Sequence, residues 1–165
     1  MTTPPIHQKR LSTYLNDHLA GSTAGLELAK RSASSNAGAP YGDFLAGLVK
    51  EIDEDRATLM DLMERLGVGK DRLKVSLGWA AEKVGRLKLN DQLIGYSPLS
   101  RLIELEGLLL GVSGKRALWM ALQPVLAGDT RLAGIDFEAL IERAHRQVQG
   151  LEDHRRSAAV EALTD

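Results

Sequence analysis

The sequence predicts an all-α protein that folds as one four-helix bundle. Four long stretches carry apolar residues every three or four positions, which is typical of amphipathic helices, and no stretch shows the alternation of a strand. A short link joins the first stretch to the second, and another joins the third to the fourth. About thirty residues separate the two pairs. We therefore expect two antiparallel hairpins joined by a long crossover. The 165 residues suffice for one such domain.

The first predicted hairpin comprises residues 9–31 and 41–66. Its first helix has apolar residues at helical spacing from Leu11 to Ala29, and the turn-rich residues 32–40 follow it. The second helix starts near Tyr41 and carries its own apolar stripe. Gly67 and Gly69 end it, because glycine is favoured immediately after a helix.

The second predicted hairpin has clear start signals. Ser97 is a favourable N-cap and Pro98 fits the first helical position, so the third helix begins there. This helix is apolar almost all round to Leu122, and we expect it to be the most buried element. The fourth helix follows a loop and has Asp136 as its N-cap, with an inner face that extends to Ala158.

The crossover, residues 67–96, is too long for an unstructured loop in a compact domain. Its apolar residues recur at helical spacing, so we expect an additional helix that packs on the bundle; they are Leu73, Leu77, Ala80, Ala81, Val84 and Leu87. Residues 1–8 contain two prolines and no apolar segment, so we expect a flexible N-terminal tail before a single domain at 9–165.

The composition excludes several classes of protein. The chain has no cysteine, which rules out disulfides and thiolate metal ligands, and its net charge of −1 gives no general attraction to nucleic acid. The longest apolar run, residues 107–113, is too short to cross a bilayer. We expect a cytoplasmic protein with no membrane insertion and no nucleic-acid partner, forming a homodimer.

Acidic and histidine residues on the apolar stripes are the candidate site. Burying an ionised side chain is costly unless it is paired or holds a metal. Glu106 is the acid that we expect to be most buried, and Glu104 we expect to be exposed. The candidate metal ligands are Glu27, Glu51, Asp55, Glu106, Glu152, His18 and His145.

Two interpretations of these residues remain open. In the first, the acids form ion pairs, and for Glu51 and Asp55 the candidate partners are Arg56, Arg72, Arg101 and Arg116. Glu27 would then be a solvated charge beside Lys30 and Arg31, and His18 a hydrogen-bonded core residue. In the second interpretation, the acids hold a metal ion or transfer protons, and the absence of cysteine favours iron, manganese or zinc as the metal.

The chain also resembles the ferritin-like superfamily. The resemblance lies in the two hairpins with inward carboxylates, in residues 15–20 (Leu-Asn-Asp-His-Leu-Ala) and in residues 102–106 (Leu-Ile-Glu-Leu-Glu). It implies a ferritin-like bundle, whose metal-binding members have a Glu-x-x-His pair on each of two helices. Here only the last helix has such a pair, Glu142 and His145. The metal site is therefore expected to be degenerate or absent.

Residue counting along the expected helices groups the candidates by depth. Glu27, Glu51, Glu106 and Glu152 fall about 10–15 Å from one end of the bundle, at about 1.5 Å per residue. His18, Asp55 and His145 fall roughly 20–25 Å from that end.

Three functions follow as expectations. The first is a binding or structural module without metal, and the second is an iron- or manganese-dependent oxidase or storage protein. The third is a carrier of a small apolar ligand in a cavity lined by Leu109, Leu110 and Trp119. Gly107, Gly111 and Gly114 predict that another helix approaches the third helix closely.

Overall fold

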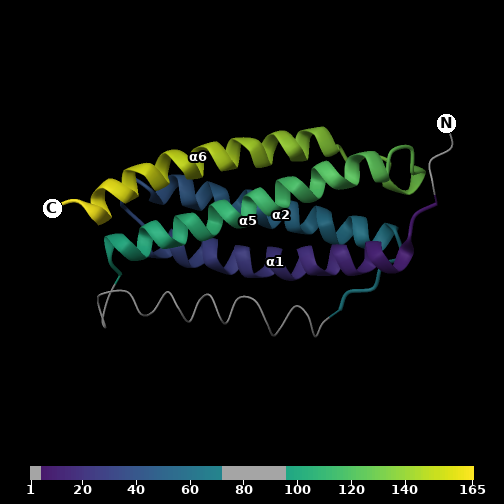
Figure 1. Cartoon of the computed structure of the whole chain (residues 1–165), viewed down its shortest axis with the longest axis horizontal. Helices are drawn as coiled ribbons and strands as arrows, with labels where there is room; N and C mark the ends of the chain where they lie inside the picture. Colours follow the sequence, from purple (N-terminus) through teal and green to yellow (C-terminus); the bar gives the residue numbers. More distant parts are fainter. Residues whose placement is uncertain (1–4, 72–95) are drawn as a thin grey trace.

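The computed structural model describes residues 5–71 and 96–165, and within them the chain is all-helical, as predicted (Figure 1). Four long helices dominate: α1 (Gln8–Ser35), α2 (Gly42–Arg65), α5 (Pro98–Val125) and α6 (Phe137–Leu163). A 3-10 turn, η2 (Thr130–Leu132), lies in the loop between α5 and α6. None of the described helices is long and apolar enough to cross a membrane.

The start signals read from the sequence are confirmed. The Ser97 side chain accepts a hydrogen bond from the Ser100 backbone N–H, with Pro98 opening α5. Asp136 caps α6 in the same way, through the Ala139 N–H. Gly67 adopts a φ of +70° directly after α2, a conformation that favours glycine. The end of the first helix was predicted wrongly, since α1 continues one turn past residue 31, to Ser35.

The helices form two antiparallel hairpins, α1 with α2 and α5 with α6, and α5 also packs along α1 (Figure 1). The two ends of the crossover are fixed about 30 Å apart along α1, at 1.5 Å per residue. Asn16 holds Gly69 and Asp71 at one end through hydrogen bonds of 3.0 and 2.7 Å. At the other end Asn36 donates to the Tyr96 hydroxyl at 2.7 Å. The two described ends of the connection therefore lie far apart along the bundle, and the additional helix predicted between them lies outside the described residues.

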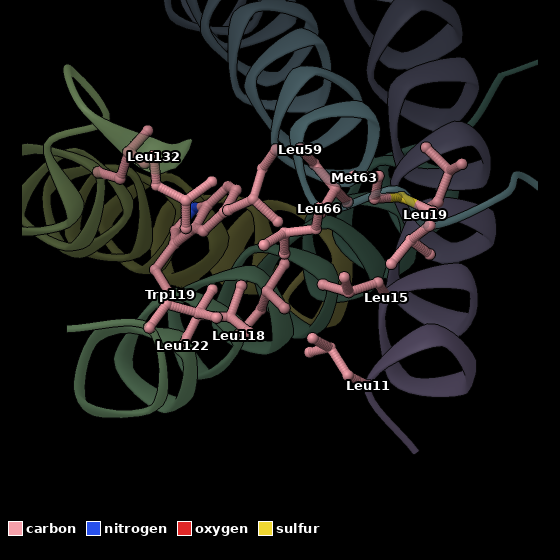
Figure 2. Close-up of a cluster of buried hydrophobic side chains, with 14 residues drawn as sticks. Leu11, Leu15, Leu19, Leu59, Met63, Leu66, Leu118, Trp119, Leu122 and Leu132 are labelled. Carbon is pink, nitrogen blue, oxygen red and sulfur yellow. The ribbon is translucent and has the colours of Figure 1, made fainter. Parts of the chain in front are cut away.

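The apolar core is divided into two clusters along the bundle. The first joins α1, α2, α5, η2 and the start of α6, and Figure 2 shows its side chains converging; its central members are Leu15, Leu59, Leu62, Met63, Leu118 and Trp119. The second joins the opposite ends of α1, α2, α5 and α6, around Leu45, Leu105 and Leu151. Polar groups and a groove lie between the two clusters, and they make up the candidate site.

Candidate functional site

A set of buried and half-buried polar side chains links α2, α5 and α6 in the middle of the bundle. We call Glu51, Asp55, Lys115, Arg143 and Gln147 the central polar layer. The Lys115 ammonium donates to Oδ2 of Asp55 and, at 2.6 Å, to Oε1 of Gln147. The amide of Gln147 in turn donates to Glu51 at 2.7 Å. Arg143 places Nη1 at 3.3 Å from the second Asp55 oxygen.

Charge compensation explains how this layer stays buried. The Asp55 side chain is only 1% exposed and that of Lys115 only 14%, so each would be costly to bury alone. Burial lowers the pKa of Lys115, and the adjacent Asp55 carboxylate partly opposes that shift. Asp55 therefore forms an ion pair, as the first interpretation expected, but among the described residues its partners are Lys115 and Arg143 and not Arg56, Arg101 or Arg116.

The predicted arginine partners have other contacts within the described residues. Nε of Arg56 donates to the Thr23 hydroxyl at 3.2 Å, and Arg101 donates to Asn36 at 2.7 Å. Arg116 lies 3.4 Å from Nδ1 of His145. Arg72 lies outside the described residues.

The remaining predicted glutamate ligands are paired with cations at the surface. Glu27 is 68% exposed and contacts Lys30 at 2.9 Å, as the solvated-charge interpretation predicted. Arg155 connects Glu152, at 2.8 Å, with Glu106, at 3.7 Å. The hydrogen bond from Arg155 lowers the pKa of Glu152 to about 2. Arg155 thus joins two of the four glutamates that the depth count grouped.

The two predicted histidine ligands lie apart from these acids. His18 packs edge-on against Tyr14, with ring centroids 4.6 Å apart, and burial lowers its pKa. His145 is exposed beside Arg116. Across residues 5–71 and 96–165, no three histidine, aspartate or glutamate side chains are placed to share a metal ion. With Lys115, Arg143 and Arg155 on the acids, the donor set does not fit a two-metal centre.

The expectation for the two glutamates of α5 is reversed. Glu104 is buried, with 6% of its side chain exposed, whereas Glu106 is 49% exposed. Arg31 donates to Glu104 at 2.9 Å and the Tyr96 hydroxyl donates to it at 3.0 Å. Because α5 packs against both α1 and α6, it has two buried faces, and Glu104 lies on the face toward α1.

Glu104 belongs to a second group of polar side chains, at the end of the bundle where Asn36 lies. Arg101 connects its members, since it donates to Asn36 and, at 2.6 Å, to Glu161. Its guanidinium also lies 4.8 Å from the centroid of the Tyr41 ring. Burial, together with the Glu104 carboxylate, raises the pKa of Tyr96 to about 12. These bonds join α1, α5, α6 and the end of the crossover, which is a structural role.

An apolar groove of about 890 Å³ opens between α1 and α5, beside the central polar layer. Ile52 and Leu59 of α2 contribute to its lining, and most of the rest comes from α5, including Leu108, Leu118 and Trp119. Its ionisable lining residues are Asp17, His18, Asp55, Arg56 and Lys115. The predicted cavity therefore exists in part, because Leu110 and Trp119 line the groove whereas Leu109 packs against the second core cluster.

Glycines on both helices create the groove. Gly21 and Gly25 of α1 and Gly111 and Gly114 of α5 line it, and a Cβ added at any of them would meet no atom within 4 Å. At Gly107 a Cβ would lie 3.1 Å from Leu28 of α1. The close helix approach predicted from the α5 glycines thus occurs at Gly107 and is wrong for the other two, which face open space.

Sequence analysis missed three members of the central polar layer: Lys115, Arg143 and Gln147. The signal was present for two of them. Lys115 lies three residues after the buried Val112 and three before the buried Leu118, which places it on the apolar stripe of α5. Gln147 lies between Ala144 and Leu151 on α6 in the same way. A basic or amide residue on an apolar stripe therefore indicates a buried polar site in the same way as an acidic residue at such a position.

Comparison with protein-family models, curated proteins and solved structures found no match for this chain. The site is therefore interpreted from its own chemistry.

Proposed function

We propose that this protein is a ferritin-like bundle that acts as a binding module, with an apolar ligand held in the groove between α1 and α5. The observation that carries this proposal is the groove itself. Its volume of about 890 Å³ lies within the range of about 300–1,000 Å³ typical of ligand pockets. Spaces between bundle helices are a common place for such sites.

The second support is that the groove leaves apolar surface uncovered in the described part of the chain. Leu110, on the groove, is 65% exposed. Four glycines of α1 and α5 face open space, although alanine would fit there and favours a helix more strongly. Each glycine costs about 1 kcal/mol of helix stability relative to alanine. A ligand that covers these positions would offset that cost by removing apolar surface from water.

On this proposal the inward acids are structural. Lys115 and Arg143 neutralise Asp55, and Arg155 does the same for Glu152. An iron or manganese site would need these carboxylates released from their cations. The ion pairs therefore favour the binding module over the alternative of an oxidase or a metal store.

Titration with Nile red, a neutral apolar dye, tests the proposal through a matched pair of variants. Gly111→Leu places a side chain in the groove, and Gly47→Leu places the same side chain on the exposed face of α2, where a Cβ also meets nothing within 4 Å. We expect Gly111→Leu to weaken dye binding about tenfold or more, because the new side chain occupies the ligand's volume, while Gly47→Leu binds like the wild type. Equal binding by all three proteins would show that the groove is not the site.

A further inference from the structure

The groove has one cationic side chain whose charge is not balanced by a carboxylate in the described part of the chain. This is Arg56 of α2, which is half-buried. Its Nε donates to the Thr23 hydroxyl at 3.2 Å, and Thr23 in turn donates to the Leu19 carbonyl oxygen at 3.1 Å. A guanidinium has five N–H donors. The Thr23 bond uses one and fixes the orientation of the group, which leaves both Nη atoms for a ligand.

The other ionisable groups of the groove do not cancel this charge. Lys115 and Asp55 neutralise one another. Burial lowers the pKa of His18 from an ordinary value of 6.5, so its imidazole is neutral at pH 7. Asp17 has an interaction of its own. The groove thus combines apolar walls with one guanidinium, that of Arg56, which forms no ion pair with a carboxylate of the described residues.

We propose that the ligand of this groove is a fatty acid whose carboxylate binds the Arg56 guanidinium while its alkyl chain lies along α1 and α5. The inference rests on the proposed function, since it names the ligand class of the same groove. A carboxylate matches the two Nη groups in a bidentate arrangement. A single carboxylate also balances a single guanidinium, whereas a phosphate monoester carries about −1.5 to −2 at pH 7 and would retain excess charge.

The alkyl chain has room beside Arg56, because Arg56 lines the same groove as Gly21 and Gly25 of α1, two of the glycines that open it. Gly111 and Gly114 open it from the side of α5. The apolar lining residues Leu59, Leu118 and Trp119 belong to the first core cluster, so the groove extends into the protein interior.

Equilibrium dialysis with radiolabelled dodecanoate and dodecanol at pH 7 tests this inference, because the two ligands share the chain and differ in the charged end. We expect the wild type to prefer dodecanoate about tenfold or more, the usual effect of a hydrogen-bonded ion pair. Arg56→Gln should lose that preference and still bind dodecanol. Arg56→Lys, which keeps the charge, should retain part of it. The matched control is Lys50→Gln, which removes an exposed charge from the same helix outside the groove.

Each other outcome has a distinct meaning. If Arg56→Gln binds dodecanoate as tightly as the wild type, the head-group assignment is overturned and the groove remains an apolar site. If Arg56→Gln loses the same affinity for dodecanoate and for dodecanol, the assignment is also overturned, because Arg56 would then shape the groove and not bind the carboxylate. Tighter binding of dodecyl phosphate than of dodecanoate would replace the carboxylate by a phosphate. If the wild type binds neither dodecanol nor Nile red, the proposed function fails as well.

Discussion

The buried pair of Asp55 and Lys115 makes a prediction that can be worked from the structure. Asp55→Ala removes the carboxylate and strands the Lys115 ammonium, which is 14% exposed and keeps Gln147 as a hydrogen-bond acceptor. Breaking one partner of a buried ion pair typically costs about 3–5 kcal/mol. That is a large share of the roughly 5–15 kcal/mol that stabilises a native domain.

Deprotonation of Lys115 sets an upper limit on that cost. A lysine with an ordinary pKa of about 10.4 can lose its proton at pH 7 for about 4.6 kcal/mol, since one pH unit corresponds to about 1.36 kcal/mol. At pH 9 the same step costs only about 1.9 kcal/mol. We therefore expect Asp55→Ala to lose about 3–4.6 kcal/mol at pH 7 and less than about 2 kcal/mol at pH 9.

The direction of this pH dependence follows from proton binding. In the variant the pKa of Lys115 is lower in the folded chain than in the unfolded chain. Between those two values the unfolded chain binds more protons, so the free energy of unfolding rises with pH. The tyrosines do not interfere at pH 9, because burial moves the pKa values of Tyr14, Tyr41 and Tyr96 upward from 10.0.

Urea unfolding followed by circular dichroism at pH 7 and pH 9 measures both values. Asp53→Ala is the matched control, because Asp53 is an exposed aspartate on the same helix, and we expect it to change stability by less than about 0.5 kcal/mol. Adding Lys115→Met to Asp55→Ala should restore much of the loss at pH 7, since the Lys115 charge is then absent and Arg143 keeps its ion pair with Glu54 at 2.9 Å. A loss below about 1 kcal/mol at pH 7, or one that stays the same at pH 9, would refute the reasoning.

Three further predictions concern packing and titration elsewhere in the bundle. Gly111→Ala should raise the free energy of unfolding by up to about 1 kcal/mol. Gly42→Ala should lower it, because a backbone carbonyl oxygen lies 2.7 Å from the position of its Cβ. Urea unfolding measures both, and a shift of both variants in the same direction would contradict the prediction. Glu104→Gln should cost about 1–3 kcal/mol and Glu106→Gln less than about 0.5 kcal/mol, and thermal melts in the opposite order would show that the buried acid was assigned wrongly. With its pKa raised to about 12, Tyr96 contributes stability below about pH 10 that is lost as pH rises toward 12. The free energy of unfolding of Tyr96→Phe should therefore fall less steeply than that of the wild type between about pH 10 and 12. Unfolding titrations that give parallel curves for the two proteins would disprove this role.

The helices could be predicted because their signals are local. The caps at Ser97 and Asp136 need only a few neighbouring residues to act, and the apolar spacing of each stretch is visible without its partner. The end of α1 was missed because residues 32–35, Ser-Ala-Ser-Ser, resemble a turn in composition. Burial of Ser32 and the hydrogen bond from Asn36 to its carbonyl oxygen extend the helix there.

The partners of the inward acids could not be predicted, because they depend on how the helices are rotated against one another. Glu104 and Glu106 are two residues apart on a helix that is apolar almost all round, so the sequence does not say which one faces a neighbouring helix. Asp55 finds its cation 60 residues away, on α5. Lys115, which fulfils the role, was not among the four predicted arginine partners, because only the packing of α5 against α2 brings its ammonium to Asp55.

The same limitation applies to the glycines, and it explains why the groove lies beside the central polar layer. Gly107 and Gly111 are one helical turn apart, and the sequence predicts a close helix approach at both. Gly107 lies against Leu28, whereas Gly111 faces open space. The division of the core into two clusters accounts for the difference. Where the clusters separate, Asp55 and Lys115 fill the interior between α2 and α5 and also line the groove. A salt bridge built into the chain thus forms the polar side of the groove, and Arg56 is left to determine which head group can enter.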